Sequence, residues 1–558
     1  MPTPTPILQR LEAAADAGHH VVFVNGATSD TVGWRQIHDE ARAVGAALQA
    51  RGLGPGDHVA ILGPTTRALV TTIRACWMSG MASMVLPLPM RMGSIEEFVH
   101  QTRARILHGD AKVLLIDDQL APFYEPAPGD PPTVPLGAVQ PGPGRPGPDA
   151  VELPAADPER LAILQYTSGS TSEPKGVMIP DRVLGANLDA IASCVRLDVD
   201  VDVLVSWLPL YHDMGLVGLL GLPMTTGCGL VQAAPQDFMA KPGAWMQWIS
   251  DHRGTATAGP NFSWVLATRA LKRMSGLDLS SLRVALNGAE PVDPDAVEAF
   301  VAEAARHGMD PGAVFPAFGM AEVAIAGTFP ALGRGLVTDA VDRIVLEQEG
   351  RAVPVEPADP DFERRARRFP LLGRAVPGLQ IRVVDPASGS MRADREVGEL
   401  EIFGTSVTPG YYKRPDVNEV LFRDGWLRTG DLAYLLEGEL VLCGRIKDVI
   451  IVGGRNVFPE DIERAVGVID GVRAGNVIAF GVEGYKGKES VVVVAEVRGD
   501  HDLDKVRHAI HERTLEVSGL PPRDVMLVKA STLPKTSSGK LQRALCRQRY
   551  LDENLELA

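Results

Sequence analysis

Short apolar runs alternate with helix-like stretches along most of this chain, and this alternation constrains the fold more strongly than any other feature. A helix-like stretch at 34–52 is followed by apolar runs at 59–62, 82–86 and 113–116. The same alternation continues from 200 to 330. Buried strands separated by helices produce this pattern, so the sequence predicts a layered α/β fold.

The pattern changes toward the C-terminus. A chain of 558 residues exceeds the size of a single core and is expected to divide into roughly two to four domains. Past residue 390, short alternating strands indicate a small β-rich subdomain, and a fresh βαβ-like pattern follows a predicted boundary at 444–447. Residues 125–156 are rich in Pro, Gly, Asp and Ala, and we expect them to form an exposed connection inside a domain.

Charge and cysteine usage exclude several classes of protein. The formal net charge is −15, which argues against a general nucleic-acid or membrane-surface binder, because such partners recruit Lys and Arg clusters. The 5 cysteines are scattered without paired spacing, so neither a disulfide framework nor a zinc site is expected. No secretory signal is apparent at the N-terminus, and no apolar run reaches the about 18 residues of a membrane span. A cytoplasmic protein without membrane insertion is predicted.

A loop rich in Gly, Ser and Thr, YTSGSTSEPKG at 166–176, follows one of the apolar runs. Backbone N–H groups and hydroxyls gathered in a small volume can replace water around a polyphosphate. The loop does not have the G-x-x-x-x-G-K-[ST] form, and its composition alone suits a flexible surface turn equally well. The candidate phosphate-binding residues are Thr167, Ser168, Gly169, Ser170, Thr171 and Lys175.

The loop resembles the phosphate motif of the adenylate-forming superfamily, which includes acyl-CoA synthetases, peptide-synthetase adenylation domains and luciferases. Further matches follow in the order of that family along nearly the whole chain, and together they are far more specific than any one of them. They are PLYHDMG at 209–215, NGAE at 287–290, FGMAE at 318–322, RTGD at 428–431, GRIKD at 444–448 and PKTSSGK at 534–540.

This resemblance implies a fold and a reaction. The fold is a large N-terminal adenylation domain over 1–445, with two α/β subdomains and a small β subdomain, and a small mobile α+β domain over 446–558. The reaction uses ATP and Mg²⁺ to convert a carboxylic acid into an acyl-AMP and pyrophosphate. The acyl group then passes to a thiol, either of coenzyme A or of the phosphopantetheine of an acyl carrier protein.

The resemblance also implies roles for individual residues, and each residue type suits its role. An aromatic ring at Phe318 can stack on a purine, Glu322 is a hard oxygen ligand for Mg²⁺, and Asp431 can accept hydrogen bonds from ribose hydroxyls. Lys540 would stabilise charge at the α-phosphate, and Lys447 lies at the hinge position. His212 is equally well explained as a gate of the acyl channel or as a satisfied buried histidine. The remaining implied nucleotide contacts are Gly288, Ala289, Glu290, Gly319, Met320, Ala321 and Arg445, and the acyl-pocket candidates are Trp207, Asn261 and Phe262.

Several motifs are most similar to those of the fatty-acyl-AMP ligases, among them LQYTSGST at 164–171 and GRNVFPEDIE at 454–463. Ala321 departs from the wider family, in which many members carry a hydroxyl there. The polar segment 333–369 has the character of an insertion, although a solvated loop explains it equally well. Its charge makes core packing unlikely for it and suggests a contact with the C-terminal domain. A non-catalytic relative that only binds acyl-adenylates is the alternative, and the joint presence of Glu322, Asp431, Arg445 and Lys540 disfavours it.

Overall fold

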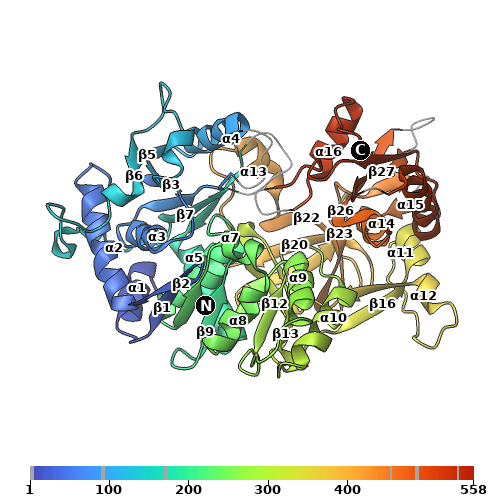
Figure 1. Cartoon of the computed structure of the whole chain (residues 1–558), viewed down its shortest axis with the longest axis horizontal. Coiled ribbons are helices and arrows are strands. Elements are labelled where there is room, and N and C mark those ends of the chain that lie inside the picture. Colours follow the sequence, from blue (N-terminus) through green and yellow to red (C-terminus); the bar gives the residue numbers. More distant parts are fainter. Residues whose placement is uncertain are drawn as a thin grey trace.

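The chain forms a layered α/β structure, as the alternation of apolar runs predicts (Figure 1). Sheets and helices follow one another along the sequence, and the C-terminal strands and helices gather on one side of the molecule (Figure 1). Within the described ranges, no helix combines the length and the apolar character needed to cross a membrane. The computed structural model describes residues 5–89, 95–166, 174–452, 455–483, 489–499, 501–536 and 540–558.

The larger of two main sheets has seven strands in the order β13-β12-β11-β9-β10-β1-β2. Its strands pair in parallel, except β1 with the edge strand β2, which is antiparallel. The edge strand is mostly exposed, whereas the interior strands are mostly buried, as expected for a sheet covered by helices. The bounds are β1 His20–Asn25, β2 Thr28–Gly33, β9 Val203–Ser206, β10 Gly229–Gln232, β11 Ala256–Gly259, β12 Val284–Asn287 and β13 Val314–Pro316.

The second main sheet has six strands in the order β6-β5-β3-β4-β7-β8, and only the β7–β8 pair is antiparallel. Strand β3 is buried at every position, which explains the apolar run that follows His58. The phosphate-loop candidate lies between β7 and β8. The bounds are β3 His58–Leu62, β4 Ala82–Val85, β5 Ala111–Ile116, β6 Thr133–Pro135, β7 Leu161–Tyr166 and β8 Gly176–Pro180.

Helices connect the strands of both sheets, and one large apolar cluster joins the two sheets into a continuous core. The helices are α1 Ile7–Ala15, α2 Trp34–Gln49, α3 Arg67–Met78, α4 Ile95–His108, α5 Asp181–Cys194, α6 Leu222–Thr226, α7 Pro235–Ala240, α8 Gly243–Asp251, α9 Asn261–Leu271 and α10 Pro294–Ala305, with the wider π-type turn η4 at Met214–Gly221 and the short turns η1 Ala121–Phe123, η2 Leu136–Ala138, η3 Pro148–Ala150, η5 Pro311–Ala313 and η6 Ala321–Val323.

Between 318 and 445 the chain is mainly β, and its part past residue 390 is the β-rich region that the short alternating strands predict. Its main unit is an antiparallel sheet in which β22 pairs with β20, β21 and β23. The bounds are β14 Phe318–Gly319, β15 Ala326–Phe329, β16 Thr338–Asp342, β17 Ala366–Pro370, β18 Arg374–Ala375, β19 Leu379–Val384, β20 Gly398–Gly404, β21 Phe422–Arg423, β22 Trp426–Leu436 and β23 Glu439–Arg445, with helices α11 Arg343–Glu349, α12 Phe362–Arg365 and α13 Pro415–Leu421.

The C-terminal part is a small α+β unit around the sheet β26-β27-β28. Alternate residues of these strands face two separate apolar clusters, one containing Val493 and the other Val494. Residues of α14 and α15 join the first cluster, and Cys546 of α16 joins the second. The bounds are β24 Ile450–Val452, β25 Arg455–Val457, β26 Val472–Glu483, β27 Glu489–Val497, β28 Asp524–Val528, α14 Pro459–Gly467, α15 Leu503–Ser518 and α16 Arg543–Leu551.

Two expectations about loops are wrong. Residues 125–156 are not merely an exposed connection, because β6 adds a parallel strand beside β5, and Leu136 and Val139 are buried. The segment 333–369 does supply core packing: β16 and β17 pair, and Leu346 and Phe369 are buried. Two of its buried charges, Glu347 and Arg367, are tolerated there because they pair with Arg455 and Asp461.

Candidate functional site

Acidic side chains from several elements and one lysine converge beside the main sheets. Glu322 lies in η6, Asp431 lies on β22, and Asp213 precedes η4, and all three are buried. Glu290 follows β12. Each of these carboxylates except Glu322 contributes to the field at Lys540, which approaches from the C-terminal part. Residues scattered over more than half of the sequence therefore meet in one site.

The Lys540 ammonium lies among these carboxylates. Burial is the largest influence on Lys540 and lowers its pKa below the ordinary value, and the charge of Arg445 lowers it further. The carboxylates of Asp213, Glu290 and Asp431 act in the opposite direction and raise it. The Lys540 carbonyl accepts the backbone N–H of Thr536 at 2.8 Å. Among the residues that the structure describes, the ammonium itself has no hydrogen-bond or ion-pair partner, so it is available to a ligand.

Glu322 is fixed by a tyrosine that the motif comparison did not single out. The Tyr411 hydroxyl donates a hydrogen bond of 2.5 Å to Glu322 Oε1. Burial raises the pKa of Glu322, and repulsion from Asp213 and Asp431 adds to this effect, while the bond from Tyr411 opposes it. Within the described part of the chain, Glu322 Oε2 has no hydrogen-bond partner. A buried carboxylate repelled by others in this way favours a bound cation.

Asp431 and Arg445 face one another on the neighbouring strands β22 and β23. Arg445 Nε donates to Asp431 Oδ1 at 3.2 Å, and the Asp431 backbone N–H donates to Thr429 Oγ1 at 3.1 Å. Burial raises the pKa of Asp431, and Arg445 opposes that effect. Asp431 is only 5% exposed, whereas Arg445 is largely exposed, so this pair connects the buried site with solvent.

The side chains of His212 and Asp213 contact each other just before η4. His212 Nδ1 lies 2.6 Å from Asp213 Oδ1, and the Met214 backbone N–H donates to the same oxygen at 2.8 Å. Burial opposes ionisation of Asp213, but His212, Lys540 and the Met214 N–H together lower its pKa. This carboxylate is therefore ionised, and the half-buried imidazole is held in one orientation.

The predicted adenine-contacting segments approach each other closely. Ala289 has a positive φ of 68°, and a Cβ on Gly288 would lie 2.9 Å from the Ala317 carbonyl oxygen. A Cβ on Gly319 would lie 2.0 Å from the Ile325 carbonyl oxygen, which only glycine avoids. Phe318 lies beside Gly319 on β14, Met320 follows them, and Ala321 at the start of η6 is buried and carries no hydroxyl.

The acyl-pocket candidates share an aromatic wall with the core. Trp207 stacks on Phe238 with ring centroids 3.8 Å apart, and the Phe262 ring lies 6.5 Å from Trp207 at a steep angle. The Phe262 backbone N–H donates to Glu290 Oε1 at 2.8 Å, which ties this wall to the carboxylate cluster. Burial raises the pKa of Glu290, whereas the hydrogen bond from Phe262 and the charge of Lys540 lower it. Asn261 Oδ1 accepts a hydrogen bond of 3.1 Å from the Asn287 amide, which joins α9 to β12.

The remaining predicted residues are distributed as follows. Thr167, Ser168, Gly169, Ser170 and Thr171 lie outside the described residues. Lys175 is described, and its ammonium lies 5.7 Å from the centroid of the Tyr411 ring. Lys447 lies just after β23, where the surrounding protein, which partly excludes water from the ammonium, and the charge of Arg445 lower its pKa.

Sequence reasoning missed two participants. Asp213 was inside a quoted motif but received no role, although its field acts on both Glu322 and Lys540. Tyr411 lies 89 residues from Glu322 in the sequence, so no local pattern joins them. The available signal was two adjacent tyrosines after Gly410 in an otherwise β-rich region.

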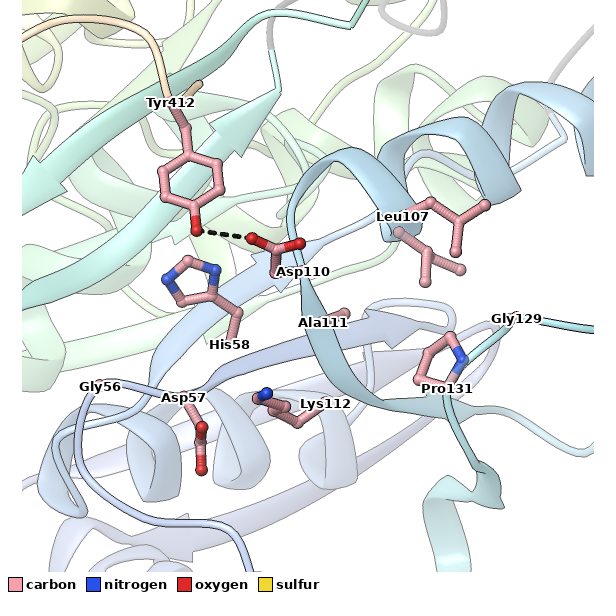
Figure 2. A pocket seen from close by; sticks show the side chains of 11 residues that line it. Gly56, Asp57, His58, Leu107, Asp110, Ala111, Lys112, Gly129, Pro131 and Tyr412 are labelled. Atoms are coloured by element: carbon pink, nitrogen blue, oxygen red, sulfur yellow. Dashed lines mark hydrogen bonds between the residues drawn. The ribbon is translucent and has the colours of Figure 1, made fainter.

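A pocket of about 440 Å³ is lined in part by Tyr412, the neighbour of Tyr411 in the sequence (Figure 2). The Tyr412 hydroxyl points to Asp110 and donates to it at 2.9 Å, and His58 lies below the Tyr412 ring (Figure 2). His58 Nδ1 lies 2.6 Å from the Gly109 carbonyl oxygen, so this nitrogen carries the proton. The pocket contains none of the clustered carboxylates, and we do not identify it with the reaction site.

Comparison with known proteins gives matches over the whole described chain. A family described as "AMP-binding enzyme" matches residues 11–412, and one described as "Disco-interacting protein 2-like, AMP domain" matches residues 447–558. A putative ligase of Mycobacterium tuberculosis, Rv1013, is 38% identical over 526 residues, which cover 92% of this chain and 93% of that protein. The medium-chain-fatty-acid acyl-carrier-protein ligase JamA of Moorena producens is 35% identical, covering 73% of this chain and 70% of that protein.

Among solved structures, one from a study of fatty acyl-adenylate ligases from E. coli and L. pneumophila superposes with a TM-score of 0.90 at 31% identity. The match covers 99% of this chain and 98% of that one. The arrangement of both the N-terminal and C-terminal parts is therefore similar to that of a solved acyl-adenylate ligase.

Proposed function

The chain belongs to the AMP-binding enzymes, a family of adenylate-forming ligases, and we propose that it activates an apolar carboxylic acid and passes the acyl group to a phosphopantetheine thiol. In the first step a carboxylate oxygen attacks the α-phosphorus of ATP, a new O–P bond forms, and pyrophosphate leaves with the electrons of the broken bond. In the second step the thiol sulfur attacks the acyl carbon and AMP leaves. The thiol proton passes to solvent.

The observation that carries this proposal is the position of Lys540 among Asp213, Glu290 and Asp431. An ammonium at this place attracts both the substrate carboxylate and the α-phosphate, which otherwise repel each other as they approach. Negative charge spreads over the phosphoryl oxygens in the transition state, and a positioned cation stabilises it. Lys540 thus acts by charge and position and needs to transfer no proton.

Residues of the site fit the magnesium nucleotide that the family uses. Glu322 is a hard oxygen ligand with one oxygen held by Tyr411, and burial, with the nearby carboxylates of Asp213 and Asp431, raises its pKa, an effect that a bound cation would oppose. Magnesium would neutralise phosphate charge when it is bound. Asp431 would accept hydrogen bonds from ribose hydroxyls through Oδ2, since Arg445 donates to Oδ1. Phe318 would stack on the adenine.

The acyl substrate is proposed to be largely apolar. Trp207, Phe238 and Phe262 supply aromatic surface next to the carboxylate cluster, and an apolar chain gains free energy by leaving water for such a surface. The relative JamA is named for medium-chain fatty acids, which agrees with an aliphatic substrate.

The acceptor is proposed to be the phosphopantetheine of an acyl carrier protein. The name of JamA includes an acyl-carrier protein, and the large structural overlap with fatty acyl-adenylate ligases favours the same choice. A thiol arm must reach the acyl carbon, so residues 446–558 are proposed to form a domain that turns about Lys447 and withdraws Lys540 after the first step.

The segment 333–369 is proposed to restrain that turn, because it contacts the C-terminal part directly. Arg367 pairs with Asp461 at 3.0 Å, and Glu347 pairs with Arg455. Figure 1 shows α11 and β16 beneath the C-terminal helices α14 and α15. A restrained turn would favour acceptors that bring binding energy of their own, as a docking carrier protein does.

The test is pyrophosphate release from ATP across saturated carboxylic acids of increasing chain length, with Lys540→Ala as the control. Acids that release pyrophosphate are then offered with free coenzyme A or with a phosphopantetheinylated carrier protein. Release with some acids and faster transfer to the carrier protein would support the proposal. Faster transfer to coenzyme A would contradict the acceptor assignment, and no release with any acid would favour a relative that only binds adenylates.

A further inference from the structure

Arg543, at the start of α16, joins the catalytic-lysine loop to the proposed hinge. It follows Lys540 by three positions, and Asp448, which it contacts, follows Lys447 by one. We propose that Arg543 is a positioning residue for adenylation that fixes Lys540 relative to the turning point of the C-terminal part. This inference rests on the proposed function, since it concerns the step in which Lys540 acts.

The Arg543 guanidinium contacts carboxylates from two separate segments. Nη1 donates to Asp448 Oδ2 at 2.7 Å, just beyond the hinge position. Nη2 donates to both oxygens of Glu463 at 2.9 Å and to Glu460 Oε1 at 3.3 Å, and both of these acids lie on α14. Glu463 Oε1 also accepts the Ala479 backbone N–H at 2.9 Å, which extends the network to β26.

These contacts are shielded from water, so they are stronger than exposed ion pairs. The side chains of Arg543, Asp448 and Glu463 are 16%, 17% and 15% exposed. Burial opposes the charge on Arg543, but the surrounding carboxylates outweigh it and raise the pKa of the guanidinium. A planar guanidinium with five N–H donors can satisfy several carboxylates in fixed directions, which the ammonium of a lysine cannot do.

Lys540 depends on this anchor because its own side chain has none. Among the described residues, Lys540 Nζ has no hydrogen-bond or ion-pair partner, and only its backbone is held. The Lys540 N–H donates to Thr536 Oγ1 at 3.1 Å, and the Gln542 N–H donates to the Pro534 carbonyl oxygen at 2.9 Å. The backbone then enters α16 at Arg543, so a shift of that residue moves the lysine directly.

The network also defines which residues move together. Asp448, α14, β26 and the start of α16 are connected through one guanidinium, so they turn as one body. The rotation must therefore be absorbed on the N-terminal side of Asp448, at or near Lys447. A loosened network would leave Lys540 with a wider range of positions when the domain is closed.

The experiment compares Arg543→Gln and Arg543→Lys with wild type in the two half-reactions. Displacement of a reacting group by about 1 Å can cost about 100-fold in rate, so we expect acyl-AMP formation by Arg543→Gln to fall by about that factor, with the KM for ATP little changed. Transfer from purified acyl-AMP to a thiol should keep its wild-type rate, since Lys540 is then withdrawn. The adenylation rate of Arg543→Lys should lie between those of Arg543→Gln and wild type, because lysine keeps the positive charge but cannot bind several carboxylates in fixed directions as the planar guanidinium does.

Arg547→Gln is the matched control, since Arg547 lies on the same helix and contacts only the Gly481 carbonyl oxygen in the described structure. It should retain both half-reactions. In the double variant Lys540→Ala/Arg543→Gln, adenylation should be no slower than in Lys540→Ala alone, because the two residues act as one unit.

Equal loss of both half-reactions in Arg543→Gln and Arg543→Lys, or additive losses in the double variant, would overturn the inference in favour of a purely structural arginine. Wild-type adenylation by a folded Arg543→Gln would also overturn it. Absence of pyrophosphate release from the wild-type enzyme is a different result, and it would refute the proposed function instead.

Discussion

The two parts that build the site are held in place by different kinds of interaction. Glu322 and Asp431 belong to elements whose apolar residues join the main core, which includes Val323 and Leu427. Lys540 belongs to a C-terminal part whose contacts with the segment 333–369 combine two ion pairs and a cation–π contact with a small apolar cluster that includes Leu346 and Phe458. The difference indicates that Glu322 and Asp431 are fixed by one large apolar core, whereas the part that we propose to turn adds ion pairs, which water can replace, to a smaller apolar contact.

Arg367 shows how such a contact is built. Its guanidinium lies 4.4 Å from the ring centroids of both Phe369 and Phe458, and Nε pairs with Asp461 at 3.0 Å. Removal of one partner of a buried pair costs about 3–5 kcal/mol, because the other charge stays buried and unpaired. When the whole interface opens, both charges regain water, and the net cost is far smaller. An ionic interface can thus be specific when closed and still be released.

The largest effect on the reaction rate is expected from a change in the C-terminal part, at Lys540. Lys540→Ala removes the cation that we propose faces the α-phosphate, and acyl-AMP formation should fall by about 10³-fold or more. Its melting temperature should remain that of wild type, because the ammonium packs against no apolar core. Pyrophosphate exchange and thermal unfolding measure the two quantities. Near-normal adenylation would show that the C-terminal part contributes no catalytic group.

The next largest effect is expected in the N-terminal part, where Asp431 is fixed on β22. Asp431→Ala removes an acceptor for two hydroxyl donors, and hydrogen bonds to a charged group contribute about 1.5–3 kcal/mol each. We expect ATP affinity to fall by at least the contribution of one such bond, about 10- to 100-fold, in calorimetric titration. Asp431→Asn keeps one acceptor oxygen and should fall less. Unchanged affinity in Asp431→Ala would remove Asp431 from the nucleotide site.

A smaller effect is expected at the interface itself. Arg367→Leu should favour the open arrangement, so that the ratio of thiol transfer to adenylation rises by about 3- to 10-fold, which corresponds to about 0.6–1.4 kcal/mol. Rapid-quench measurement of each half-reaction gives this ratio. Arg365→Leu is the control, because Arg365 pairs with Asp342 and Asp359 within the N-terminal part. The same change in both variants would mean that the interface does not restrain the turn.

The smallest effect is a change in pH dependence. The pKa of Lys540 lies below its ordinary value, and the ammonium is lost as pH rises through it. In wild type, kcat/KM for adenylation should therefore decline at a pH below the value of about 10.4 typical of free lysine. In Lys540→Arg the side chain stays charged, so any residual activity should lack this decline. An identical decline in both enzymes would assign it to another group.

Much of the fold could be predicted because its signals are local. Buried strands of the main sheets are marked by short apolar runs, such as residues 59–62 of β3, and the loop around Lys540 is a contiguous motif. Interactions between distant residues left no such signal. Glu347 is separated from its partner Arg455 by 108 positions. From the sequence alone its charge therefore predicts an exposed side chain, although the side chain is buried.

The neighbouring tyrosines 411 and 412 have a consequence for protein engineering. The Tyr411 hydroxyl reaches Glu322, and the Tyr412 hydroxyl reaches Asp110 at the pocket of Figure 2. Their shared backbone is pinned where the Tyr412 N–H donates to the Gly176 carbonyl oxygen at 2.8 Å, on the strand that follows the phosphate-loop candidate. A designer who reshapes either cavity therefore has two linked sites to optimise, and libraries that vary the two positions together will recover combinations that stepwise selection misses.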